Sequence, residues 1–104
     1  MLFFAKAEFI DTVPLSIEKF LELAVAEWET ISKYKSQGKV LTGGALKDRK
    51  GGCGIFNVDS KQELDNLLSG LPMFQFLEWE IIPLETIEGA LNAAIKALAK
   101  HRSL

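Results

Sequence analysis

The 104-residue sequence predicts a single α+β domain whose elements follow the order strand, helix, strand, strand, helix, strand, with one further helix at the end. Three observations lead to this prediction. Apolar and polar residues alternate in 2–9 and 76–83, which is the period of a strand. Apolar residues recur every three or four positions in 17–37, which is the period of a helix that faces a core. Two further apolar stretches, 39–46 and 52–58, flank a charged turn and predict a hairpin.

Boundary signals support the first strand and the first helix. The strand 2–9 ends in a turn that contains Asp11 and Pro14. Ser16 follows and is placed to cap the helix, because its hydroxyl can accept from a free backbone N–H of the first turn. Gly38 comes directly after the helical pattern and predicts a left-handed C-terminal cap.

The hairpin is the least regular part of the pattern. Its turn, residues 47–51, reads KDRKG and is strongly charged. Gly43 and Gly44 weaken the strand before this turn or introduce a bulge in it, because glycine offers no side chain to pack.

The second half of the chain has equally clear helix signals. Asp59 or Ser60 caps a short leucine-rich helix. Gly70 ends this helix, and Pro72 prevents it from resuming. After the strand 76–83, Thr86 caps the terminal helix.

This order of elements is the split βαβ pattern of ferredoxin-like folds, βαββαβ, in which both helices cover one face of a four-stranded antiparallel sheet. Both alternating sets of strand residues contain large apolar side chains, so neither face of the sheet is suited to water. We therefore expect a second copy of the chain to cover the bare face, in a homodimer or larger homo-oligomer. Residues 1–85 form the ferredoxin-like domain and 86–104 a C-terminal helical extension of it, whose apolar stripe predicts a contact beyond the basic dimer.

Composition excludes several functional classes. Twelve basic and fourteen acidic residues give a net charge of −2, without the basic excess that nucleic acid binding demands. The single Cys53 and the single His101 provide no cluster of zinc ligands. The apolar start is interrupted by Lys6 and Glu8, too early for a signal peptide or a membrane span. We expect a soluble cytoplasmic protein with no metal, no nucleic acid and no membrane partner.

Two adjoining motifs carry a family resemblance. Residues 68–74 read LSGLPMF and residues 76–84 read FLEWEIIPL, and together they resemble the muconolactone isomerase family over roughly residues 1–85. The resemblance implies a dimeric α/β barrel, in which two ferredoxin-like sheets pack face to face. It also implies a reaction that moves a proton within an unsaturated lactone and needs no metal or organic cofactor.

The strand at 40–46 departs from this resemblance. Typical members carry tryptophan, arginine and histidine there, groups that hold a substrate carboxylate and move protons. This chain reads VLTGGAL, and none of these side chains does either job. We therefore do not expect authentic muconolactone isomerisation, and the fold is carried over more safely than the function.

Glu27 is the candidate catalytic residue. Its neighbours along the helix are mostly apolar, and it matches an acidic position in the first helix of the resembling family. Loss of water around it would raise its pKa and suit it to general acid or base chemistry. The alternative is a solvated residue at the edge of the helix that pairs with a lysine.

Two further groups are candidate ligand-binding residues. The first and last strands are expected to be antiparallel neighbours, which brings together Lys6, Glu8, Glu78 and Glu80. The alternative for these charges is a structural ion pair at the dimer interface or at its rim. The second group is aromatic: Tyr34, on the helix of Glu27, and Phe74, which with Phe76 and Trp79 lines a pocket or packs in the core.

Two functions from different classes remain open. The first is a cofactor-independent isomerase or proton-transfer enzyme that acts on a small, largely apolar organic compound of the lactone or enol type. The second is a non-catalytic homo-oligomeric domain that binds a small ligand. Glu27 favours the first function, and the apolar strand 40–46 favours the second.

Overall fold

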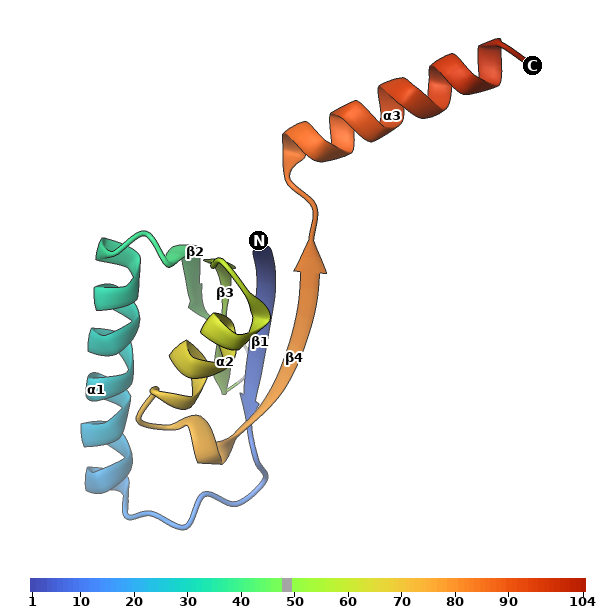
Figure 1. The fold of residues 1–104 in the computed structure, drawn as a ribbon. Helices are drawn as coiled ribbons and strands as arrows, with labels where there is room; N and C mark the ends of the chain where they lie inside the picture. Colours follow the sequence, from blue (N-terminus) through green and yellow to red (C-terminus); the bar gives the residue numbers. More distant parts are fainter. Residues whose placement is uncertain (48–49) are drawn as a thin grey trace.

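The computed structural model describes residues 1–47 and 50–104, in the element order that the sequence predicts (Figure 1). Asp48 and Arg49 of the predicted hairpin turn lie outside the described residues. The elements are β1 (Leu2–Phe9), α1 (Ile17–Ser36), β2 (Val40–Ala45), β3 (Gly51–Asn57), α2 (Lys61–Ser69), a 3-10 turn (Phe74–Phe76), β4 (Leu77–Leu84) and α3 (Ile87–Arg102).

The four strands form one antiparallel sheet in the order β2-β3-β1-β4. Both α1 and α2 lie on the same side of this sheet (Figure 1). The predicted ferredoxin-like α+β fold is therefore confirmed.

The predicted helix caps are also confirmed. Ser16 accepts a hydrogen bond from the backbone N–H of Lys19, and Thr86 accepts one from Gly89. Of the two candidates for α2, the structure selects Ser60, whose hydroxyl accepts from Glu63 N. Each cap satisfies a backbone donor that the first helical turn leaves unpaired. At the other end of α1, Gly38 has a φ of +76°, the left-handed conformation expected there.

The position of the bulge in β2 corrects the prediction. We expected Gly43 and Gly44 to disturb this strand, but both pair in register with β3. The register shifts instead between Val40 and Thr42, so the extra residue is Leu41. An added Cβ on Gly43 would collide with the carbonyl oxygen of Cys53, so this glycine allows the two strands to approach.

The core lies between the sheet and α2. Its buried apolar residues come from three strands, α2 and the segments that flank them: Phe3, Ala5, Val40, Phe56, Val58, Leu64, Leu68 and Leu71. Trp79 and Ile81 of β4 pack against this cluster, as the alternation in that strand predicts. We call this side of the sheet the covered face.

The opposite side of the sheet, which we call the uncovered face, combines apolar and charged residues. The register aligns Phe4 of β1 with Ile55 of β3 and Ile82 of β4, which makes an apolar row across three strands. Lys6 lies opposite Glu80, and Glu8 lies opposite Glu78. Ile82 is 41% exposed, so this row faces outward in the single chain.

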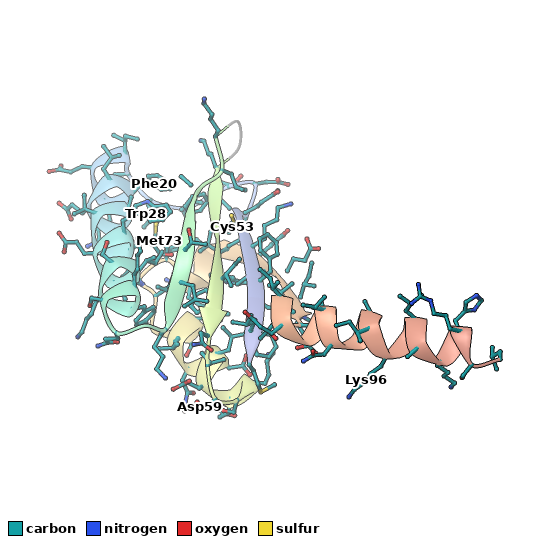
Figure 2. The ribbon with its side chains drawn as sticks, turned by 90° about the horizontal axis from the view of Figure 1, so that it is seen from above. Phe20, Trp28, Cys53, Asp59, Met73 and Lys96 are labelled. Atoms are coloured by element: carbon teal, nitrogen blue, oxygen red, sulfur yellow. The ribbon has the colours of Figure 1, made fainter. Side chains whose placement is uncertain are left out.

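Helix α3 projects away from the rest of the chain (Figure 1). The chain measures 64 × 28 × 22 Å, and its radius of gyration of 17.5 Å exceeds the roughly 13 Å of a compact domain of this length. Lys96 on α3 lies far from the side chains of α1 (Figure 2). The apolar stripe of α3 is exposed along its length, at Ile87, Leu91, Ile95 and Leu98. Within the described chain, no helix has the length and hydrophobicity needed to cross a membrane.

Candidate functional site

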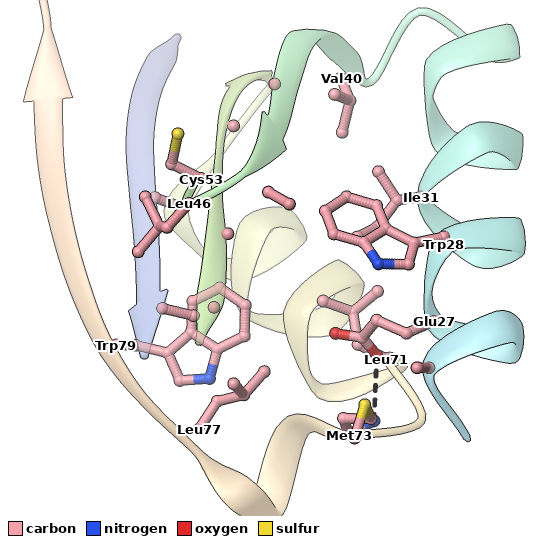
Figure 3. Close-up of a pocket in the computed structure, with 18 of the residues that line it drawn as sticks. Glu27, Trp28, Ile31, Val40, Leu46, Cys53, Leu71, Met73, Leu77 and Trp79 are labelled. Atoms are coloured by element: carbon pink, nitrogen blue, oxygen red, sulfur yellow. Dashed lines mark hydrogen bonds between the residues drawn. The ribbon is translucent and has the colours of Figure 1, made fainter. Parts of the chain in front are cut away.

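A cavity of about 460 Å³ lies between α1 and the covered face of the sheet (Figure 3). This volume is within the roughly 300–1,000 Å³ typical of small-molecule sites. Residues from α1, all four strands and the segment after α2 line it. Phe20, Trp28 and Met73 lie together at this position in the side-chain view (Figure 2).

Small residues make up a large part of the cavity lining that the sheet supplies. Seven of these lining residues are glycine or alanine: Ala5, Ala7, Gly43, Ala45, Gly51, Gly52 and Gly54. Because their side chains end at Cβ or earlier, the space between the sheet and α1 stays open. Gly43 and Ala45 of β2 are therefore part of what forms the cavity.

Glu27 is the buried charged residue of the cavity wall. It is 7% exposed, and its Oε1 accepts a hydrogen bond of 3.0 Å from the backbone N–H of Met73. Burial raises the pKa of the Glu27 carboxyl above its usual 4.5, while the Met73 hydrogen bond opposes the shift. The alternative of a solvated residue paired with a lysine does not match this position.

The hydrogen bond to Glu27 depends on the path of the chain after α2. Gly70 ends that helix, and Pro72 follows, where a helix cannot easily resume. The buried Leu71 and Met73 anchor this segment against the cavity, which directs Met73 N toward α1. The donor lies 46 residues beyond its acceptor.

Tyr34 lies beside the cavity but does not line it. Its hydroxyl donates a 2.8 Å hydrogen bond to the carbonyl oxygen of Leu67 and so ties α1 to α2. Burial raises the pKa of the Tyr34 hydroxyl, and the nearby charge of Glu27 raises it further. This contact gives Tyr34 a structural role, and a ligand contact for it stays a prediction.

The charged candidates gather elsewhere, in a shallow hollow on the uncovered face. Lys6, Glu8, Glu78 and Glu80 surround about 240 Å³ of open space there. Lys6 pairs with Glu8 of its own strand at 3.3 Å rather than with a glutamate of β4. The sheet separates these four residues from Glu27, so the structure does not bring the two sets of candidates into one site.

Phe74 supports the cavity wall from outside. Its ring stacks on Trp79, with centroids 6.1 Å apart and an interplanar angle of 29°. Phe74 is 39% exposed, whereas Trp79 lines the cavity. A direct contact of Phe74 with a ligand stays a prediction.

Sequence reasoning did not single out Trp28 or Met73. Trp28 fits the apolar stripe of its helix, and nothing in the sequence separates it from core packing. In the structure it is 40% exposed and lies over the cavity.

Two lysines and no metal-binding cluster complete the electrostatic picture. Lys35 and Lys50 line the cavity and are exposed, so they lie at its mouth. Among residues 1–47 and 50–104, no three His, Cys, Asp or Glu side chains are grouped so that they could hold a metal ion.

Comparisons with known proteins agree with the fold. A family profile described as muconolactone delta-isomerase matches residues 1–90. A muconolactone isomerase structure matches with a TM-score of 0.74 at 23% identity, over 83% of this chain and 90% of that one. The structure of 5-chloro-2-hydroxyhydroquinone dehydrochlorinase from Burkholderia phenoliruptrix, in complex with 2,5-dihydroxybenzoquinone, matches with a TM-score of 0.65 at 17% identity, over 85% and 97% of the two chains. These identities show a shared fold. A comparison with curated proteins found no match.

Proposed function

Because the chain belongs to the muconolactone delta-isomerase family, we propose that it is a cofactor-independent isomerase or related proton-transfer enzyme that acts on a small organic compound of the lactone or enol type. The observation that carries this proposal is Glu27, a carboxyl group 7% exposed in the wall of an apolar cavity of about 460 Å³. Burial moves its pKa upward, toward the pH at which a carboxyl group both accepts and returns a proton efficiently.

A single carboxylate is sufficient for such a step. Glu27 takes a proton from a carbon next to a conjugated carbonyl group, and the C–H electron pair moves into the resulting dienolate. Glu27 then returns the same proton to a different carbon, so the product is an isomer and no group is lost. The Met73 N–H holds Oε1, while Oε2 has no hydrogen-bond partner within the described chain and is available to the substrate.

The structural comparison supports a small ring compound as substrate. The matched dehydrochlorinase structure holds 2,5-dihydroxybenzoquinone, a ring that carries carbonyl and enol-type oxygens. The departure of 40–46 from the family pattern argues against muconolactone itself, because no arginine or histidine of that strand is present to bind a carboxylate.

We also propose that two copies pair through their uncovered faces. The apolar row of Phe4, Ile55 and Ile82 supports this, since a face of this kind is costly to leave in water. Residues 86–104 would then act as an arm that extends the assembly beyond the dimer, because α3 exposes its apolar stripe and projects from the body.

Deuterium exchange tests the catalytic proposal. The full-length protein is incubated in D₂O with an unsaturated lactone such as α-angelica lactone, and NMR follows both deuterium uptake and isomerisation. We expect Glu27→Gln to keep the fold and lower the rate by roughly 100-fold or more, the usual scale for a general acid or base. Glu29→Gln is the matched control, because Glu29 is exposed on the same helix. An equal rate in folded Glu27→Gln would exclude Glu27 from the reaction.

One observation favours the non-catalytic alternative. The part of the wall that β2 and the residue after it supply is apolar, formed by Val40, Gly43, Ala45 and Leu46. It offers no charged or hydrogen-bonding side chain to hold a substrate in position beside Glu27. If lactones bind equally well to the wild type and to Glu27→Gln and no exchange occurs with either, the chain is a ligand-binding domain.

A further inference from the structure

Both tryptophans of the chain line the cavity, and they come from opposite sides of it (Figure 3). Trp28 extends from α1, and Trp79 extends from β4. We propose that Trp28 and Trp79 form the walls of a slot for a flat, uncharged ring compound, and that Trp79 Nε1 donates a hydrogen bond to a carbonyl oxygen of that ring. This inference rests on the proposed function for its cavity and deepens it by naming the class of substrate.

Trp28 closes one side of the slot. A Cβ added to Gly52 would lie 3.2 Å from Cη2 of Trp28, so the indole reaches from α1 to the backbone of β3. The ring is still 40% exposed. A large aromatic side chain in this position leaves apolar area in water that a flat ligand would cover.

Trp79 forms the opposite wall and has an unused donor. Its Nε1 is buried, and it has no hydrogen-bond partner among the described residues. Buried indole N–H groups normally find an acceptor, because an unpaired donor loses the hydrogen bond it makes with water. Phe74 stacks on this indole. A small tilt of the indole toward the cavity would bring its N–H to an occupant.

The floor between the two walls suits a flat molecule. The sheet contributes Ala5, Ala7 and Gly54 there, which have no side-chain atoms beyond Cβ. A planar ring can therefore approach the backbone of the sheet, with an indole on each side. The cavity volume of about 460 Å³ accommodates a one- or two-ring compound.

The charges of the cavity favour an uncharged ring. Glu27 is the buried ionisable group of the described lining, and the cations Lys35 and Lys50 are exposed at the mouth. An anionic group that entered beside Glu27 would lose its hydration and lie close to a second carboxyl. A carbonyl oxygen loses less hydration and can accept from Trp79.

Three flat probes test the proposal on the full-length protein by equilibrium dialysis. Coumarin is uncharged and has a carbonyl oxygen, naphthalene has a similar shape without one, and 2-naphthoate adds a negative charge. We expect coumarin to bind about 3- to 10-fold more tightly than naphthalene, the effect of one hydrogen bond. We expect 2-naphthoate to bind at least about 10-fold more weakly than naphthalene, because its charge is buried without a partner.

Two matched variants separate the hydrogen bond from packing. Trp79→Phe keeps an aromatic ring and removes the N–H, so the preference for coumarin over naphthalene falls to about one. Trp28→Phe removes an N–H that has no role in the proposed slot and makes the ring smaller. We therefore expect both probes to bind more weakly and the preference for coumarin over naphthalene to remain. A structural role for Trp79 would instead lower the affinity for both probes and leave the preference unchanged.

Several outcomes would overturn the proposal. Equal binding of coumarin and naphthalene to the wild type would contradict the proposed hydrogen bond. Tighter binding of 2-naphthoate than of naphthalene, through Lys35 and Lys50, would show that the cavity prefers anionic rings. If no probe binds, the two tryptophans do not form a binding slot. The binding slot and the catalytic proposal can fail independently. Glu27→Gln is expected to bind coumarin as tightly as the wild type. If both proteins bind coumarin and neither catalyses proton exchange, only the catalytic proposal is contradicted.

Discussion

The two faces of the sheet differ although the same strands form both. On the covered face β1 presents Phe3, Ala5 and Ala7, which are buried, and the last two line the cavity. On the uncovered face the same strand presents Phe4 and Lys6, which are partly exposed. Because side chains alternate along a strand, neighbouring residues of β1 enter different environments, and one strand contributes to two different surfaces. Small residues leave a cavity on one face, and larger apolar and charged residues are partly exposed on the other.

A charge on the uncovered face should change the behaviour of the protein most. We expect Ile82→Glu to weaken self-association by roughly 100-fold or more, because a carboxylate between paired faces would be buried without a partner at a cost of several kcal/mol. Sedimentation of the full-length protein measures the change. Val25→Glu is the control, since Val25 is 59% exposed on α1. A dimer that survives Ile82→Glu would show that this face is not the interface.

The arm, residues 86–104, is a third region, which differs from both faces of the sheet because it projects away from them. We expect a chain that ends at residue 85 to keep its fold and lose assembly beyond the dimer, because α3 exposes Leu91 and Ile95 away from the body. Light scattering gives the mass, and circular dichroism reports whether the sheet remains. An unchanged mass with unchanged solubility would contradict this role for residues 86–104.

A smaller effect concerns the pH dependence of stability on the covered face. In the folded chain the pKa of Glu27 is raised above 4.5, its usual value, which we take for the unfolded chain. At pH values between the unfolded and the folded pKa, the folded state therefore holds more protons than the unfolded state. Stability from this group is therefore full below pH 4.5 and is lost as the pH rises through the folded pKa. We expect Glu27→Gln to gain stability relative to the wild type over this rise, as measured by urea unfolding. A constant difference between the two proteins would contradict the burial of the charge.

The smallest effect concerns Glu63, whose pKa is lowered in the folded chain, whereas that of Glu27 is raised. Glu63 accepts from Asp59 N at 2.9 Å and pairs with Lys39 at 3.0 Å, and these contacts lower its pKa below 4.5. Its contribution is present above that pH and is lost as the pH falls through the folded pKa. We expect Glu63→Gln to be slightly less stable than the wild type near neutral pH and equal to it in acid. Urea unfolding at both pH values measures this, and a variant of equal stability throughout would show that water screens the pair.

Most of the fold could be predicted because its signals are local. Alternation places β1 at Leu2–Phe9, and Ser16 and Thr86 mark the starts of α1 and α3. Each signal involves residues within about four positions of one another, so the chain carries them before it folds. The bulge at Leu41 was not predictable in this way, because it depends on how β2 pairs with β3.

The candidate site was predictable only in part. Apolar helical neighbours identified Glu27, but they did not distinguish a solvated edge from a buried wall. Its burial depends on Met73, which donates from 46 residues further along the chain. The proximity of Lys6 to Glu80 followed from the strand order, yet the ion pair forms with Glu8, because side-chain conformation decides between partners at similar range.

The elements, their order, the two adjoining family motifs and a carboxyl group on an apolar helix face can all be read from the amino-acid order. That Glu27, Trp28 and Trp79 share a cavity, while the charged residues of β1 and β4 lie across the sheet from it, emerges only in the folded chain. The two kinds of feature differ in the sequence separation over which they arise. Backbone preferences act over a few residues, whereas burial, pKa and cavity shape arise from segments that meet only when the chain has folded.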